Sequence, residues 1–240
     1  MEITPALTDI LFLDIETVSC VANYESLHDR LKPLWDKKSL FLKQEGTSCE
    51  ALFFERAGIY AEFGKIVAIA VGVFHKNEFG ELSLRIKAIA SDNEKVLLLE
   101  FKELLESKFD ADTLHLCAHN GKEFDFPYIC RRMTCHGITL PKVLEIAGKK
   151  PWEVKHLDTL EMWKFGDRKN YTSLELLAAL FDIDTSKEAI DGSMVNHVYH
   201  VEKDLDKIAA YCKLDVLVIA KLYLKLKCLP GIQQENIFIL

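Results

Sequence analysis

Residues 10–16 read ILFLDIE, a short apolar run in which Asp14 and Glu16 stand two positions apart. The run predicts a buried β-strand. Because side chains alternate between the two faces of a strand, both carboxylates are expected on the same side of the sheet. Two acids placed together repel each other and lose hydration, and a divalent cation is the usual compensation because hard cations prefer oxygen ligands. The triplet alone is weak evidence, since a chain of this size contains roughly one D-x-E by chance.

Outward from this strand, the sequence predicts alternating strands and helices. Residues 65–74 and 82–90 are rich in β-branched residues and predict a hairpin. Further strands are predicted over residues 113–118 and 154–157, and helices over 93–109, 173–181 and 205–226, with another beginning at Asp125. This order indicates an α/β fold, a mixed five-stranded sheet flanked by helices, in a single domain over residues 1–240. Residues 19–63 are interpreted as an insertion or lid, and residues 228–240 as a C-terminal tail.

The bulk composition is that of a folded globule, with 49% hydrophobic and 28% charged residues among 240. The net charge of −7 counts against a protein that coats nucleic acid, because such proteins usually carry a basic excess. It counts less against a nuclease, whose carboxylates are neutralised by bound cations.

The seven cysteines are scattered and form no C-x-x-C pair, which favours free thiols in a reducing compartment over disulfides or a zinc site. The first residues have no basic leader, and the longest apolar run, residues 66–74, is too short to cross a bilayer. We therefore expect a soluble, cytoplasmic protein with no membrane partner.

Two further groups of residues carry acids in positions that suit a site. Residues 119–125 read HNGKEFD and follow the predicted strand 113–118, where α/β folds place ligand-binding groups. Asp125 is also compatible with a simple helix N-cap. Tyr211 and Asp215 are four residues apart, so a helix places both on one face, although a surface aromatic and a solvated charge would fit the same spacing.

The three motifs together, D-I-E, N-x-x-x-F-D and Y-x-x-x-D in this order, resemble the exonuclease motifs of the DEDD superfamily in its tyrosine branch. The histidine branch would have His five residues before the last Asp, where this chain has Ala210. The resemblance spans roughly residues 9 to 227 and is strongest to the proofreading domain of family-B DNA polymerases. No polymerase-sized region remains, so the chain is similar to a free-standing relative of that domain.

The resemblance implies a ribonuclease H-like fold and a two-metal-ion 3′–5′ exonuclease. The four acids, Asp14, Glu16, Asp125 and Asp215, would hold two divalent cations, Mg²⁺ or Mn²⁺. Tyr211 would orient the attacking water, and the product would be a nucleoside 5′-monophosphate released from the 3′ end of single-stranded DNA.

The same resemblance implies the contacts to the substrate. The backbone of Thr17 and Val18 would meet the terminal sugar, and Asn120 and Phe124 would contact the last nucleotides. Phe124 is equally compatible with a core aromatic. Among the basic residues, those of the polar turn before residue 173 are candidates for phosphate contacts, namely Lys164, Arg168 and Lys169.

Two neighbouring polar residues favour structural roles, Asp158 as a helix cap and His119 as a hydrogen-bonding residue. Two alternative functions stay open. One is a 3′-end-trimming ribonuclease, since the same metal chemistry cleaves RNA and DNA and nothing in the sequence senses a 2′-hydroxyl. A non-catalytic module that binds single strands on a nuclease fold is the other, although degeneration of that kind normally removes an acid.

Overall fold

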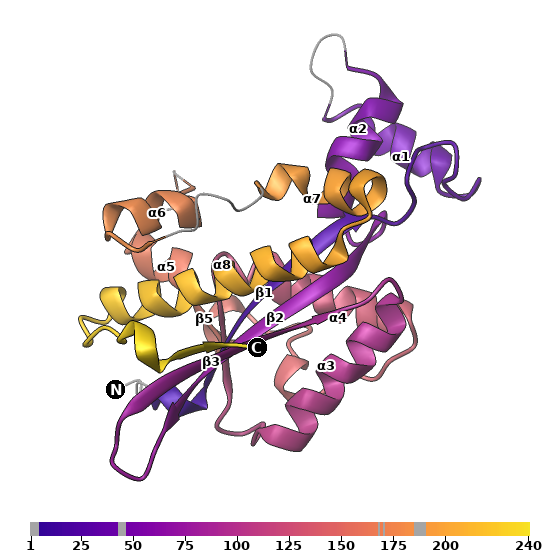
Figure 1. The fold of residues 1–240 in the computed structure, drawn as a ribbon. Coiled ribbons are helices and arrows are strands. Elements are labelled where there is room, and N and C mark those ends of the chain that lie inside the picture. Colours follow the sequence, from indigo (N-terminus) through magenta and orange to yellow (C-terminus); the bar gives the residue numbers. More distant parts are fainter. Residues whose placement is uncertain (1–4, 43–46, 168, 170, 185–190) are drawn as a thin grey trace.

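The computed structural model describes residues 5–42, 47–167, 169, 171–184 and 191–240. Within them the chain forms one mixed β-sheet with helices on both faces, as the sequence predicted (Figure 1). The strands are β1 (Ile10–Ser19), β2 (Gly64–Lys76), β3 (Leu82–Ala90), β4 (His115–Ala118), β5 (Leu157–Asp158) and β6 (Ile237–Ile239). They lie in the order β5-β4-β1-β2-β3-β6. The prediction of five strands was wrong, because part of the expected tail adds a sixth.

β1 lies inside the sheet and is paired on both sides. It runs antiparallel to β2, with Asp14 opposite Ala70, and parallel to β4. Its odd-numbered apolar side chains pack into one hydrophobic core and its even-numbered ones into the other. A strand covered on both faces requires apolar side chains on both, which explains the unbroken run before Asp14. The strand continues past its predicted end at residue 15 to Ser19, with a register irregularity between Glu16 and Thr17.

Helices form a layer on each face of the sheet. Their bounds are α1 (Lys32–Ser39), α2 (Cys49–Arg56), α3 (Glu94–Lys108), α4 (Asp125–Cys135), α5 (Thr159–Lys164), α6 (Leu174–Leu180), α7 (Val195–His197) and α8 (Leu205–Leu226). α8 crosses one face, over β1, β2 and β3 (Figure 1). Beneath it, the ring of Phe12 packs edge-on against Phe74 and Tyr223, with centroids 5.6 and 5.5 Å away. No helix in the described part of the chain is long and apolar enough to cross a bilayer.

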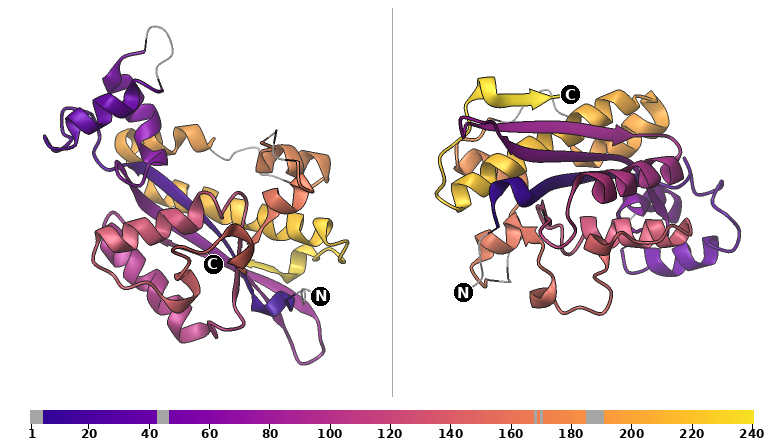
Figure 2. Two further views of the ribbon diagram at one scale, coloured as in Figure 1. Left: turned by 180° about the vertical axis from the view of Figure 1, so that it is seen from behind. Right: turned by 90° about the horizontal axis from the view of Figure 1, so that it is seen from below.

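α3 and α4 cover the opposite face and are joined by a buried acid (Figure 2). The carboxylate of Glu94 accepts hydrogen bonds from Nε and Nη2 of Arg132 at 2.9 and 2.6 Å, and from the backbone N–H of Ile66 at 2.8 Å. Nε2 of His136 lies 2.7 Å from the same carboxylate. This network ties α3 and β2 to α4, the helix that begins with Asp125.

Most predicted elements agree with the structure. The hairpin is β2 and β3, and the helices predicted over residues 93–109, 173–181 and 205–226 are α3, α6 and α8. The side chains of Asn93 and Ser173 cap α3 and α6. The strand predicted over residues 154–157 was misplaced. β5 comprises only Leu157–Asp158, because β4 is short and offers partners only at Cys117 and Ala118.

The segment 19–63 was predicted to be an insertion or lid, and its described residues, 19–42 and 47–63, project beyond the sheet where β1 ends (Figure 1). Within the described part, α1 and α2 pack around a separate cluster centred on Trp35, whose ring contacts Phe53 and Phe63 edge-on. This segment is linked to α7, because the side-chain N–H of Asn196 donates to the carbonyl of Phe54 at 2.7 Å. Its function as a lid stays a prediction.

The expected C-terminal tail docks on the sheet. β6 pairs parallel with β3, placing Ile237 opposite Leu84. The backbone N–H of Leu240 donates to the carbonyl of Ile86 at 2.8 Å, and Nζ of Lys213 donates to the carbonyl of Leu240 at 3.0 Å. The apolar residues at this end therefore extend the sheet at its β3 edge.

The Glu94 network makes a prediction about stability. Arg132→Ala is expected to lower the free energy of unfolding by about 3–5 kcal/mol, because it leaves the Glu94 carboxylate buried without its main charge partner. Urea denaturation followed by circular dichroism measures the change. Lys142→Ala, which removes the exposed ion pair with Asp112, is the control and is expected to change the free energy of unfolding little, because solvent screens exposed pairs. Equal losses in the two variants would contradict the prediction.

Candidate active site

β1 brings two acids to the face covered by α8. Asp14 is half-buried and Glu16 is 8% exposed. A carboxylate oxygen of each and the sulfur of Cys212 all lie within 4.8 Å of one another. The sequence prediction that both carboxylates share one side of the sheet therefore agrees with the structure.

The thiol of Cys212, on α8, was missed by the sequence analysis. Its Sγ donates to the backbone carbonyl of Asp14 at 3.3 Å and to Oδ2 of the same residue at 3.4 Å. Burial raises the pKa of this thiol well above its usual range, so it stays a protonated donor. The signal available in the sequence was its position three residues before Asp215, on the same side of the helix.

Asp125 reaches the same site from the N-terminus of α4. Its Oδ1 accepts the backbone N–H of Ile15 at 3.2 Å, and the residue is 3% exposed. The alternative of a simple N-cap does not hold, because Phe124 occupies the cap position and Asp125 is the first helical residue. Burial raises the pKa of Asp125 to about 7, although the backbone hydrogen bonds oppose the shift.

α8 supplies the tyrosine and the fourth acid. The hydroxyl of Tyr211 donates to the carboxylate of Asp215, as their four-residue spacing on one helix allows. Burial raises the pKa of Asp215 to about 6. Burial and the charges of Asp215, Glu16 and Asp14 raise the pKa of Tyr211 well above its usual range, so the phenol remains protonated.

The four carboxylates are close enough to raise one another's pKa. Burial, followed by the charges of neighbouring acids, raises the pKa of both Asp14 and Glu16 well above the usual range. Basic side chains are not among the largest contributions to these four pKa values, and within the described residues none of the four acids forms an ion pair.

The donor set fits divalent cations. Glu16 is more than nine-tenths buried, yet within the described ranges its carboxylate accepts no hydrogen bond that would replace its hydration. Clustered carboxylate oxygens are the ligands that Mg²⁺ and Mn²⁺ prefer. In the described part of the chain, the group compact enough to hold one ion is Asp14, Glu16 and Cys212, and Asp125 and Asp215 add their charges beside it.

The turn before Asp125 is fixed by Asp158. Oδ1 of Asp158 accepts the backbone N–H of Asn120 at 2.9 Å, and Oδ2 accepts that of Lys122 at 3.1 Å. The same carboxylate caps α5 through the N–H of Leu160 at 2.9 Å, so the expected capping role is confirmed. Asn120 has φ of 63°, a conformation that asparagine tolerates better than most residues.

His119, in the same turn, is also a structural hydrogen-bonding residue, as expected. Its Nδ1 lies 2.9 Å from Oγ1 of Thr159, and its Nε2 lies 2.9 Å from the carbonyl of Thr172. It therefore joins the turn to the segment between α5 and α6.

The predicted sugar contacts, Thr17 and Val18, lie at the end of β1. Val18 is fully buried, so only its backbone is available to a ligand. This end of the strand is held by α7, because Oδ1 of Asn196 accepts the backbone N–H of Ser19 at 2.8 Å. Nε2 of His200 lies 3.0 Å from the carbonyl of Ser19. Asn196 and His200 were not predicted from the sequence, since neither residue belongs to a recognisable motif.

The remaining predicted contacts are less definite. Phe124 is half-buried and its ring packs on that of Tyr128 with centroids 5.4 Å apart, which suits a core aromatic with one accessible edge. Lys164 is half-buried and Lys169 exposed, whereas Arg168 lies outside the described residues. Contacts of these residues with nucleic acid stay predictions.

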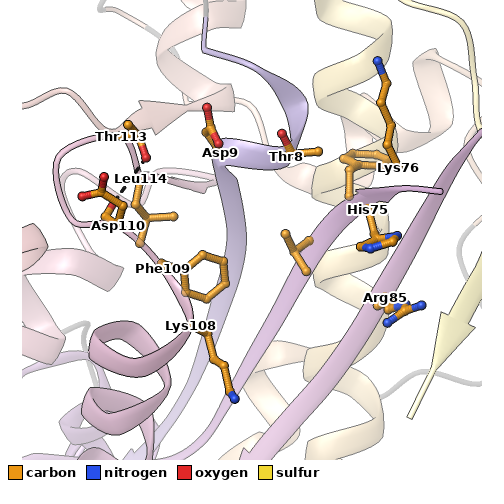
Figure 3. Close-up of a pocket in the computed structure, with 12 residues that line it drawn as sticks. Thr8, Asp9, His75, Lys76, Arg85, Lys108, Phe109, Asp110, Thr113 and Leu114 are labelled. Carbon is orange, nitrogen blue, oxygen red and sulfur yellow. Dashed lines mark hydrogen bonds between the residues drawn. The ribbon is translucent and has the colours of Figure 1, made fainter. Parts of the chain in front are cut away.

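A pocket at the other end of β1 is a separate feature (Figure 3). Its volume is about 450 Å³, and it lies between the start of β1, the end of β2 and the α3–β4 connection. Side chains of His75, Arg85 and Lys108 line it, but none of the four carboxylates does. It is therefore not the candidate active site.

A family of proteins has a model that matches residues 59–238, three quarters of the chain, and is described as "Predicted 3'-5' exonuclease related to the exonuclease domain of PolB". The chain belongs to this family. It is accordingly a hydrolytic nuclease of the 3′–5′ exonuclease class. The matched range contains Asp125, Tyr211 and Asp215, and it begins after Asp14 and Glu16.

The fold of this exonuclease is also found in a solved structure. The family B DNA polymerase from the hyperthermophilic archaeon Pyrobaculum calidifontis matches with a TM-score of 0.57 and 16% sequence identity. The match covers 95% of this chain and 25% of the polymerase. This likeness identifies the ribonuclease H-like fold. No curated protein matches the chain.

The repulsion among the carboxylates predicts a gain of stability on removing one charge. In metal-free protein at pH 8, Asp215→Asn is expected to raise Tm by roughly 2–4 °C for each kcal/mol of repulsion removed. The pKa of Asp215 is about 6 in the folded protein, above the value near 4 of an unfolded chain. Between these values the folded state binds more protons, so wild-type stability falls as pH rises through about 6.

The gain in Tm from Asp215→Asn should therefore vanish below about pH 4, where Asp215 is protonated in both the folded and the unfolded state. Thermal melts in chelator across this pH range measure it. Glu103→Gln, at an exposed acid on α3, is the matched control with little expected change. Added Mg²⁺ should raise the Tm of the wild type more than that of Asp215→Asn. A variant less stable than the wild type at pH 8 in chelator would refute the prediction.

Proposed function

We propose that this exonuclease hydrolyses single-stranded DNA from its 3′ end by two-metal-ion catalysis and releases nucleoside 5′-monophosphates. The observation that supports this most strongly is the gathering of four carboxylates from β1, α4 and α8, none of which forms an ion pair with a basic side chain among the described residues. Such a cluster is costly unless metal ions neutralise it.

Asp14, Glu16, Asp125 and Asp215 would hold the ions. Bound there, a pair of divalent cations supplies an activated water and stabilisation of the leaving 3′-oxygen. The protein's contribution is to fix the four oxygen ligands before substrate arrives. Asp125 is held by the N–H of Ile15, and Asp14 by the thiol of Cys212, so neither has to reorient.

Tyr211 is assigned to orienting the attacking water. Its hydroxyl faces Asp215 closely enough to lower the pKa of that acid, and its own raised pKa makes it a poor general base. A protonated phenol can donate one hydrogen bond and accept another, so it can fix the position of a water molecule without removing its proton.

The substrate end is proposed to enter beside the end of β1. The backbone of Thr17 and Val18 meets the terminal sugar, and Asn120 and Phe124 contact the last nucleotides. The fixed conformation of both segments supports this assignment, because Asn196 holds one and Asp158 the other. A cytoplasmic location is proposed as well, supported by seven free thiols.

The first prediction concerns the reaction itself. The wild type is expected to shorten a 5′-labelled DNA single strand in a ladder when Mg²⁺ is present. Asp14→Asn should lower the rate to that seen in chelator, because one ligand charge is lost. Gel analysis of the labelled strand measures both, with Asp206→Asn, at an exposed acid on α8, as the control.

The same gel distinguishes the alternatives. Discrete internal cuts would contradict an exonuclease, and equal rates for Asp14→Asn and the wild type would contradict the assigned site. A matched RNA strand is the second substrate. Faster shortening of RNA than of DNA would overturn the preference for DNA. Binding of single strands without any hydrolysis would instead support a non-catalytic module.

The second prediction concerns Tyr211. Tyr211→Phe removes the hydroxyl and keeps the ring, so kcat should fall by roughly one to two orders of magnitude, since water orientation is lost but the ions are retained. Steady-state kinetics and Mg²⁺ titration of Tm together measure the effect. An unchanged kcat would remove Tyr211 from the mechanism, and a lost Mg²⁺ response would make it a structural residue.

A further inference from the structure

Two aromatic side chains are exposed to solvent at the connection between α5 and α6. Phe165 is 88% exposed and Tyr171 is 67% exposed. Single exposed apolar residues are common on protein surfaces. These two, however, flank one short connection between α5 and α6, together with Lys164 and Lys169. We refer to Lys164, Phe165, Lys169 and Tyr171 as the α5–α6 surface.

The backbone holds Phe165 in an uncommon conformation. It ends α5 with φ of 44° and ψ of 35°, a left-handed conformation that bulky residues rarely adopt. The turn is closed by a hydrogen bond from the N–H of Asp167 to the carbonyl of Lys164 at 2.8 Å. Strained residues of this kind are concentrated at ligand sites, where the surrounding structure maintains them.

His119 joins this surface to the turn that leads into Asp125. Its ring contacts that of Tyr171 edge-on with centroids 6.4 Å apart, and its two nitrogens bond Thr159 and Thr172. Burial lowers the pKa of His119, so the imidazole is neutral and one nitrogen donates while the other accepts. Tyr171 is therefore fixed relative to the candidate site by a contact within the protein.

The charges around Tyr171 agree with this position. Burial and, after it, the carboxylates of Asp125 and Asp158 raise the pKa of Tyr171, in keeping with the contact between its ring and His119. Lys164 and Lys169 form no ion pair with any residue in the described ranges, and their charges are available to a ligand. Aromatic faces and free cations beside a nuclease site match the bases and phosphates of a single strand.

We propose that the α5–α6 surface binds the nucleotides on the 5′ side of the one being removed, with Tyr171 and Phe165 stacking on bases and the two lysines contacting phosphates. The inference rests on the proposed function. A chain of net charge −7 repels a polyanion over much of its surface, so binding requires local cations and stacking. Stacking also accepts any base, as a sequence-independent exonuclease needs.

The test measures binding and catalysis separately. Tyr171→Ala should weaken the binding of a short DNA single strand in chelator by about 5- to 150-fold, the equivalent of about 1–3 kcal/mol for one lost stack. Tyr171→Phe should bind like the wild type, because it keeps the ring. Phe79→Ala, at an aromatic that is 81% exposed in the β2–β3 turn, is the matched control and should change nothing. Fluorescence anisotropy measures affinity, and quenching of a fluorescent adenine analogue at the penultimate position reports stacking.

A substrate with no upstream nucleotide separates this inference from the proposed function. The nitrophenyl ester of thymidine 5′-monophosphate should be hydrolysed by Tyr171→Ala at the wild-type rate and left intact by Asp14→Asn. Wild-type affinity and quenching in a folded Tyr171→Ala variant would overturn the α5–α6 surface and leave the proposed function standing. Absence of metal-dependent hydrolysis in the wild type would overturn the proposed function. The affinity and quenching measurements would still show whether the α5–α6 surface binds a DNA single strand.

Discussion

The repulsion among four buried or half-buried carboxylates is the constraint on which the rest of this molecule depends. Asp14 and Glu16 must be on one face of a strand that is itself buried, because only a rigid strand holds two like charges together. Apolar residues on both faces of β1 provide that rigidity. α4 and α8 then bring the other two acids from opposite layers of the fold. The free energy of packing these layers opposes the electrostatic cost of the site.

The protein handles buried acids in two contrasting ways. Glu94 is compensated internally, and the hydrogen bonds from Arg132, Ile66 and His136 hold its pKa below the usual range despite burial. At the candidate site the compensation is missing from the chain, and the pKa of each of the four acids is raised. The first arrangement stabilises the apo fold. The second leaves an electrostatic cost in the folded protein, which the cations of the proposed function would offset.

The sequence was most informative where a local pattern of residues shows both the period of a strand or helix and the groups that the site uses. The apolar run of β1, the helical patterns of α3 and α6, and the four-residue spacing of Tyr211 and Asp215 on α8 are local patterns, and each was predicted correctly. β6 was missed because three apolar residues become a strand only when an open sheet edge is present to receive them. β5 was misplaced for the same reason, since its length is set by β4.

The site shows a similar division. The five residues of the DEDD motifs lie together, although their roles stay predictions. Cys212, Asn196 and His200 could not be predicted, because their contacts with β1 depend on how α7 and α8 cross the sheet. The exposed aromatics of the α5–α6 surface were equally invisible, since exposure follows from where a connection runs and not from its composition.

The contact between Cys212 and Asp14 joins residues 198 positions apart, and it lies at the heart of the acid cluster. During synthesis, β1 leaves the ribosome long before α8 does. Asp14 and Glu16 are therefore made long before Asp215. Contacts of such long range form late in folding because a large loop must first be closed. A partly synthesised chain that lacks α8 therefore lacks Asp215 and Tyr211 beside the acids of β1. The complete site forms only when the whole chain has folded.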